Sequence, residues 1–118
     1  MGGRHSLNKG KQYERDIANK FKAIGFTDAK RLFENREGMG YDVQDCGPFK
    51  IQCKAYAKYA PISKLEEAPN GAGDIPLLVT KGDRKQDVVC MYLTDFMEII
   101  QDVGVAWEGV VHQEDDNE

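Results

Sequence analysis

The sequence has no long apolar run and no internal repeat. A membrane-spanning helix needs about 20 consecutive apolar residues, and no stretch of the 118 residues approaches that length. The polar start, Met1 to His5, also lacks the apolar core of a signal peptide. We therefore expect a cytoplasmic protein that has no membrane partner.

Cysteine is scarce as well. The three cysteines, Cys46, Cys53 and Cys90, are odd in number and lack the spacing of metal ligands. These features argue against a disulfide framework and against a structural zinc site. We expect buried or free thiols.

Length and composition indicate a single globular domain. A chain of 118 residues has room for one modest core, and 41% hydrophobic with 31% charged residues is ordinary for such a domain. The expected organisation is a flexible basic arm over residues 1–7, the domain over 8–111 and an acidic disordered tail over 112–118.

The net charge of −4 is distributed unevenly along the chain. Residues 1–64 contain 13 Lys and Arg against 7 Asp and Glu, a net charge of +6, whereas residues 65–118 contain 3 against 13, a net charge of −10. A basic first half suits a bound polyanion such as DNA. The alternative, that both charge sets are simply solvated faces, has equal weight on this feature alone.

Residues 40–54 are typical of two short strands joined by a turn near Gly47. Side chains alternate between the faces of a strand, so Gln52 and Lys54 share a polar face, and the turn places Asp42 opposite Gln52 on that face. An acid, an amide oxygen and an ammonium group then converge on one spot, which suits a divalent metal beside a phosphate. For the second strand alone, a solvated amphipathic face is the better explanation of the pattern.

A helix is expected from about Asn8 to Gly25, because apolar residues recur there at helical spacing. The predicted buried stripe consists of Tyr13, Ile17, Phe21 and Ile24. Glu14 projects at the edge of this stripe, from which a carboxylate can reach a cleft beside the sheet. The alternative is an ordinary boundary glutamate paired with Lys11 or Lys22.

The segment 27–40 leads into the hairpin and mixes charge with glycine. Phe26, Leu32 and Phe33 are compatible with a short strand or turn. Arg31 and Arg36 lie where they could hold a phosphate backbone, or they are solvated residues of a surface loop.

After the hairpin, lysines alternate with Tyr56 and Tyr59, a pattern that combines base stacking with phosphate contact but that also suits residues covering a core edge. Residues 61–68 are predicted as a short helix, with Ser63 and Glu66 spaced as in a capping box.

Two buried strands are expected over 75–80 and 88–93. Thr94 or Asp95 then caps a last helix that ends at Gly104. Its predicted core positions are Phe96, Ile99, Ile100 and Val103. Residues 105–111 are a candidate edge strand in which Trp107 packs.

The expected order is helix, β-hairpin, strand, short helix, strand, strand, helix. It predicts an α/β (α+β) domain with a mixed central β-sheet flanked by helices.

Together and in order, several of these residues resemble the PD-(D/E)xK nuclease superfamily. They are Glu14 on the first helix, Asp42 ten residues before a Gln52-x-Lys54 motif, and a strand-strand-helix ending. The sequence is most similar to the small archaeal and phage Holliday junction resolvases, whose first helix carries Lys-Gly-Lys-x-Tyr/Phe-Glu-Arg, as residues 9–15 do here. The resemblance covers most of residues 8–101 and implies a restriction-endonuclease-like core in a prokaryotic or phage-infected host cell.

The resemblance also implies residue roles in a nuclease that depends on Mg²⁺ or Mn²⁺. Asp42 would be the central metal ligand, assisted by the Gln52 side-chain oxygen, the Cys53 backbone carbonyl and Glu14. Lys54 would position the attacking water and counter the phosphate charge. Phosphate contacts with DNA would come from basic residues: Lys11, Arg15, Arg31, Arg36 and Lys81.

Gln52 departs from the superfamily pattern, in which Glu is more common. An amide keeps the oxygen ligand but removes a negative charge, so metal affinity should fall unless Glu14 contributes more. The preferred hypothesis is an endonuclease that resolves four-way DNA junctions, and two symmetric cuts predict a homodimer. The alternatives are a nicking or restriction-type enzyme of the same fold and a DNA-binding module that has lost efficient chemistry.

Overall fold

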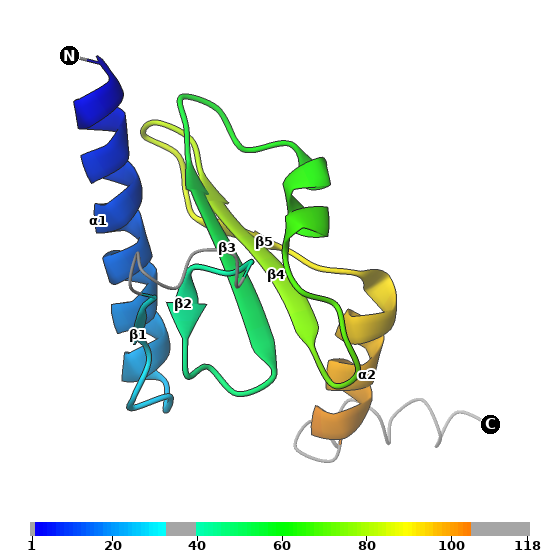
Figure 1. Ribbon diagram of the computed structural model, residues 1–118. Helices are drawn as coiled ribbons and strands as arrows, with labels where there is room; N and C mark the ends of the chain where they lie inside the picture. The colour runs from blue at the N-terminus through cyan, green and yellow to red at the C-terminus, as the bar shows by residue number, and fades with distance from the viewer. Residues whose placement is uncertain (1, 33–39, 105–118) are drawn as a thin grey trace.

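The computed structural model describes residues 2–32 and 40–104. The elements are α1 (Gly2–Ala23), β1 (Lys30–Arg31), β2 (Val43–Gln44), β3 (Phe49–Ala55), the 3-10 helix η2 (Ile62–Glu67), β4 (Ile75–Lys81), β5 (Val88–Cys90) and α2 (Leu93–Val103). The strands form one sheet in the order β1-β2-β3-β4-β5, with β3 and β4 parallel and the other neighbours antiparallel (Figure 1). The domain is therefore α+β with a mixed sheet, as predicted.

The two central strands are covered on both faces. Tyr13 and Ile17 of α1 pack with Ile51 of β3 in the main core cluster. Because alternate side chains point to opposite faces, Leu78 of β4 faces the other way and packs with Leu65 of η2. The polar residues of β3 that face η2 are therefore less exposed to solvent than they would be on an uncovered strand.

Helix α1 begins at Gly2, six residues before the predicted start at Asn8. It includes residues that the sequence assigned to a flexible arm, because no proline interrupts the segment and each residue added to a nucleated helix gains one hydrogen bond. The helix ends beside Gly25, whose φ of 126° favours glycine. Ile24 is 75% exposed, so its predicted place in the buried stripe was wrong.

The short strand β1 lies in the segment that was compatible with a short strand or turn. The predicted order also placed a strand between the hairpin and the short helix, and this was wrong, because residues 56–61 form no strand. Helix η2 follows Pro61 and has no side-chain cap hydrogen bond, so the expected capping box between Ser63 and Glu66 does not form.

Strand β5 is shorter and more exposed than predicted. It ends at Cys90 rather than Leu93, and Val89 is 56% exposed. The cause is its position as the last strand in the sheet order, where only one neighbour covers it.

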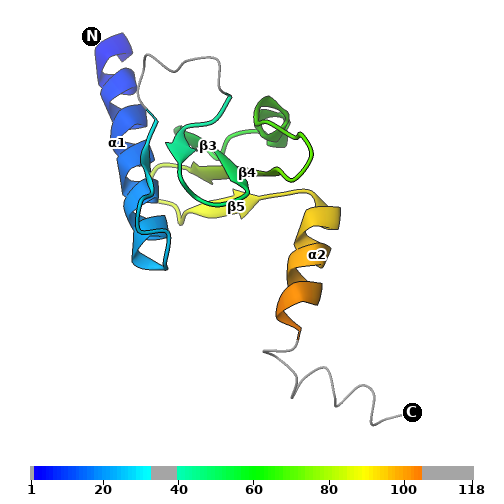
Figure 2. The same cartoon turned by 60° about the horizontal axis from the view of Figure 1, so that its bottom comes forward.

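Helix α2 has the predicted end at Gly104, but its N-cap is Tyr92 rather than Thr94 or Asp95. None of its residues is buried, and Phe96 is 48% exposed. Figure 2 shows α2 extending away from the sheet, so the expected core positions on this helix were wrong. The predicted edge strand 105–111, with Trp107, and the tail 112–118 lie outside the described residues.

The cysteine prediction is confirmed. Cys46, Cys53 and Cys90 are free thiols, the first two buried. Within residues 2–32 and 40–104, no helix has both the length and the apolar character needed to cross a bilayer.

Candidate active site

The β2–β3 hairpin sets the geometry of the site. Val43 pairs with Ile51, and continuing this register by one step places Asp42 opposite Gln52, as predicted. The connection passes through Gly47, whose φ is 61° and where an added Cβ would lie 3.2 Å from the Phe26 ring. Glycine therefore suits this turn for both backbone and packing reasons.

Asp42 is fixed at the edge of β3. Its N–H donates to the Ile51 carbonyl at 2.7 Å, and its carbonyl accepts from the Leu32 N–H at 2.9 Å. Its Oδ2 accepts the backbone N–H of Cys53 at 2.8 Å. Because the N–H and C=O of a strand residue point to the same side, the Cys53 carbonyl is directed toward this edge as well.

Gln52 is only 6% exposed, and its amide group is oriented by the backbone. Nε2 donates a hydrogen bond to the Gly40 carbonyl, which leaves Oε1 as the atom available to a ligand. A glutamate at this position could not donate that hydrogen bond while ionised. The Gly40 carbonyl therefore gives a structural reason for the amide in place of the more common acid.

Glu14 reaches the site from α1. Its Oε1 accepts a hydrogen bond from Nε of Arg31 at 2.8 Å, and the two side chains are only 19% and 17% exposed. Glu14 therefore pairs with Arg31 of β1, and the alternative of an ordinary pair with Lys11 or Lys22 was wrong. Arg31, predicted as a phosphate contact, has its Nε bound to a site carboxylate.

The two carboxyl groups influence each other. Burial raises the pKa of Glu14, and the charge of Asp42 raises it further, whereas Arg31 and Lys54 lower it. Burial likewise raises the pKa of Asp42, against the opposing effects of the Cys53 N–H and Lys54. The structure therefore brings together the acids and the lysine that the sequence selected.

Glu67 is an additional charged neighbour that sequence reasoning missed. Its Oε1 lies 3.8 Å from Nζ of Lys54, and its Oε2 accepts from Lys64 at 3.0 Å. Its charge also raises the pKa of Asp42. No local signal pointed to Glu67, because only the packing of η2 against β3 and β4 brings it to the site.

The donor set fits a hard divalent cation. Glu14, Asp42 and Gln52 each use one side-chain polar atom for the protein, and the remaining oxygens Oε2, Oδ1 and Oε1 accept no hydrogen bond from any described residue. Two carboxylates and an amide oxygen are suitable ligands for Mg²⁺ or Mn²⁺. No group of three or more His, Cys, Asp or Glu side chains able to hold a metal occurs in the part of the chain described, so the amide would have to complete the set.

The other predicted DNA contacts are dispersed. Lys11 is half-buried one turn before Glu14 on α1, while Arg15 and Lys81 are exposed. Arg36 lies outside the described residues.

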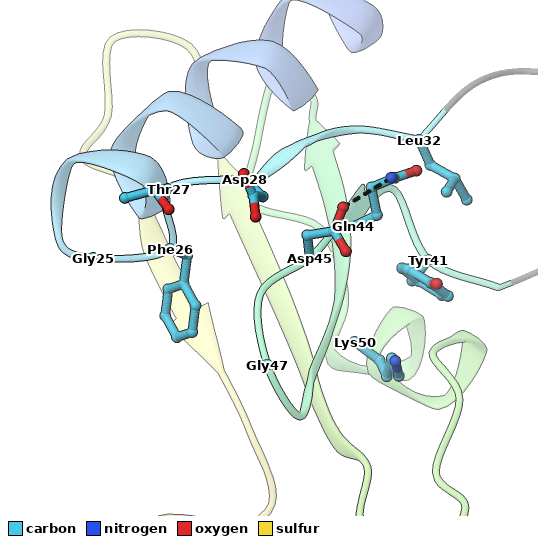
Figure 3. Close-up of a pocket in the computed structure, with 10 residues that line it drawn as sticks. All are labelled: Gly25, Phe26, Thr27, Asp28, Leu32, Tyr41, Gln44, Asp45, Gly47 and Lys50. Atoms are coloured by element: carbon cyan, nitrogen blue, oxygen red, sulfur yellow. Dashed lines mark hydrogen bonds between the residues drawn. The ribbon is translucent and has the colours of Figure 1, made fainter.

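A separate pocket of about 590 Å³ is lined by residues of the β2–β3 hairpin and of the segment that follows α1 (Figure 3). Nζ of Lys50 lies 4.9 Å from the centre of the Tyr41 ring, and Nε2 of Gln44 donates to Asp45 at 3.0 Å. Asp28 also lines this pocket. Its mixture of acids and one lysine differs from the basic surface that a polyanion requires.

No family model, curated protein or solved structure matches the chain.

Proposed function

We propose that the chain is a metal-dependent endodeoxyribonuclease of the PD-(D/E)xK type that hydrolyses phosphodiester bonds in branched DNA, with the four-way junction as its substrate. The observation that carries the proposal is the convergence of Glu14, Asp42, Gln52 and Lys54 at one edge of β3. The mixed sheet with a helix against its central strands is compatible with a restriction-endonuclease-like core.

The carboxylate oxygens of Glu14 and Asp42, the Gln52 amide oxygen and the Cys53 carbonyl would hold Mg²⁺ or Mn²⁺. When bound, such a cation lowers the pKa of water and neutralises charge on the phosphate. The protein contributes the orientation of these ligands, because Asp42, Gln52 and Glu14 are each fixed by a hydrogen bond to another part of the chain.

Lys54 supplies positive charge beside the two acids. Its ammonium group lies 3.8 Å from Glu67, a separation that is longer than a hydrogen bond. An ammonium group has three N–H donors, so those not directed at Glu67 remain available for a phosphate oxygen or for the attacking water. Half-burial of the side chain makes its charge more effective than that of a fully solvated lysine.

Cutting a junction symmetrically requires two sites, so the proposal includes a homodimer. The excess of basic residues in the first half of the chain favours a polyanionic substrate.

The test is cleavage of three labelled DNAs by the purified protein in Mg²⁺ or Mn²⁺. A four-way junction, a linear duplex with one arm's sequence, and a single strand are compared. Paired symmetric cuts in the junction are expected. Equal cutting of the duplex would overturn the junction as the substrate and favour a nicking or restriction-type enzyme. Tight binding without cleavage in either metal would favour the silent DNA-binding module.

A further inference from the structure

A groove of about 720 Å³ is lined by the middle of α1, by the ends of β3 and β4 and by the loops that follow these two strands. It lies on a different side of α1 from Glu14, since its helical residues project away from that carboxylate. Its lining includes Lys9 and Gln12 of α1, Lys81 at the end of β4, and Tyr56 and Arg84 of the two loops.

Hydrogen bonds hold the walls of the groove in place. The Tyr56 N–H donates to the Lys81 carbonyl at 3.1 Å, and the Asp83 N–H donates to the Ala57 carbonyl at 3.1 Å. Lys9 joins the helix to the loop through an ion pair of 2.8 Å with Asp83. The groove is therefore organised before any ligand binds, which reduces the entropy lost on binding.

The charge in the groove is positive. Lys9, Lys81 and Arg84 face two acids, Asp16 and Asp83. Asp83 is already paired with Lys9, and Asp16 accepts a hydrogen bond from Gln12 at 2.8 Å.

Lys81 and Arg84 are thereby left to an external anion, since neither forms an ion pair with any described residue. Tyr56 lines the same groove and is 39% exposed, so it adds an aromatic residue to this basic surface.

An exposed aromatic ring beside two cations is the combination that binds single strands, because unpaired bases offer a free face for stacking. We propose that this groove binds a single strand of nucleic acid, with a base stacked on Tyr56 and adjacent phosphates paired with Lys81 and Arg84. Tyr56 follows Lys54 by two residues, about 7 Å along an extended chain, so the strand can continue toward the candidate active site. That this single strand is an unpaired part of a branched DNA substrate rests on the proposed function, whereas the binding of a single strand in the groove does not.

The test is fluorescence anisotropy with labelled oligothymidylate and a duplex of equal length, in EDTA so that cleavage plays no part. We expect the single strand to bind more tightly, and Tyr56→Ala to weaken its binding about 5- to 100-fold. Tyr56→Phe should bind as the wild type does. Tyr59→Ala is the matched control, because Tyr59 is also 39% exposed but does not line the groove.

Charge removal gives an independent readout. Lys81→Gln and Arg84→Asn should each lower the slope of log affinity against log salt by about 0.7. Asn is chosen because Arg84 has a φ of 58°, which asparagine tolerates.

Three results would overturn the proposal. They are binding by Tyr56→Ala within twofold of the wild type, an equal loss in Tyr59→Ala, and competition by polyglutamate as effective as that by oligothymidylate. Loss of junction cleavage with single-strand binding intact would count against the proposed function alone.

Discussion

The Glu14 carboxylate accepts a hydrogen bond from Nε of Arg31 at 2.8 Å in a setting where both side chains are less than one-fifth exposed. This pair links α1 to β1 beside Asp42. Burial and the charge of Asp42 raise the pKa of Glu14, and Arg31 acts against both. Arg31 therefore helps to determine the pH above which Glu14 is ionised beside Asp42.

Arg31→Gln should shift metal binding to higher pH. Without the guanidinium the pKa of Glu14 rises further, and a cation must then displace a proton over a wider pH range. The unfolding free energy should also fall by about 1–3 kcal/mol, because a partly buried charge loses its partner. Calorimetric titration with Mn²⁺ between about pH 5 and 8 measures the shift. Arg15→Gln, at an exposed position of α1, is the control, and identical pH profiles for both variants would contradict the account.

Asp42→Asn should make the metal-free protein more stable at neutral pH. The folded state raises the pKa of Asp42, mainly through burial, so the unfolded state releases this proton more readily and Asp42 costs stability as the pH rises through its pKa. Asparagine avoids that cost and keeps an oxygen to accept the Cys53 N–H. The advantage of the variant should shrink as the pH falls to about 3, where the aspartic acid is mostly protonated in both states. A variant that is less stable at neutral pH would show that the charged hydrogen bond outweighs burial.

Gln52→Glu should destabilise the metal-free protein by about 2 kcal/mol, because a buried carboxylate would face the Gly40 carbonyl without a proton to donate. Metal should recover this loss, since the third carboxylate adds charge to the ligand set. Thermal unfolding with and without Mn²⁺ measures both effects. Gln101→Glu, at an exposed position of α2, should show neither the loss of stability nor its recovery by metal. A variant as stable as the wild type in EDTA would contradict the role assigned to the amide.

Thr80 connects the strand that carries Lys54 to the following loop. Its Oγ1 accepts the Ala60 N–H at 2.9 Å and donates to the Lys54 carbonyl at 2.8 Å, and the residue is 1% exposed. Thr80→Val should cost about 2–4 kcal/mol because two backbone groups lose their partner, whereas Thr80→Ser should cost about 1 kcal/mol for the lost methyl group. Urea denaturation distinguishes them, and equal losses would contradict this reading.

The sequence predicted the parts of the fold that local pattern determines. The alternation of polar and apolar residues, with a turn near Gly47, predicted the hairpin register that places Asp42 opposite Gln52. The helical spacing of apolar residues predicted α1, with Tyr13 and Ile17 in the core. These signals are periodicities of single elements, which the printed sequence contains in full.

The sequence could not predict what depends on packing between elements. The apolar stripe of α2 was read as core, but periodicity identifies a face and not the partner that covers it. The same limit hid Glu67, which η2 brings to Lys54, and the pairing of Arg31 with Glu14, which are 17 residues apart in the chain.

The most direct measurement of the central claim is the rate at which the wild type and Asp42→Asn cut a labelled four-way junction in Mg²⁺, with DNA binding measured in parallel. The account predicts metal-dependent paired cuts by the wild type, a loss of at least about 100-fold in the variant, and similar junction affinity for both. Cutting by Asp42→Asn at the wild-type rate would contradict it.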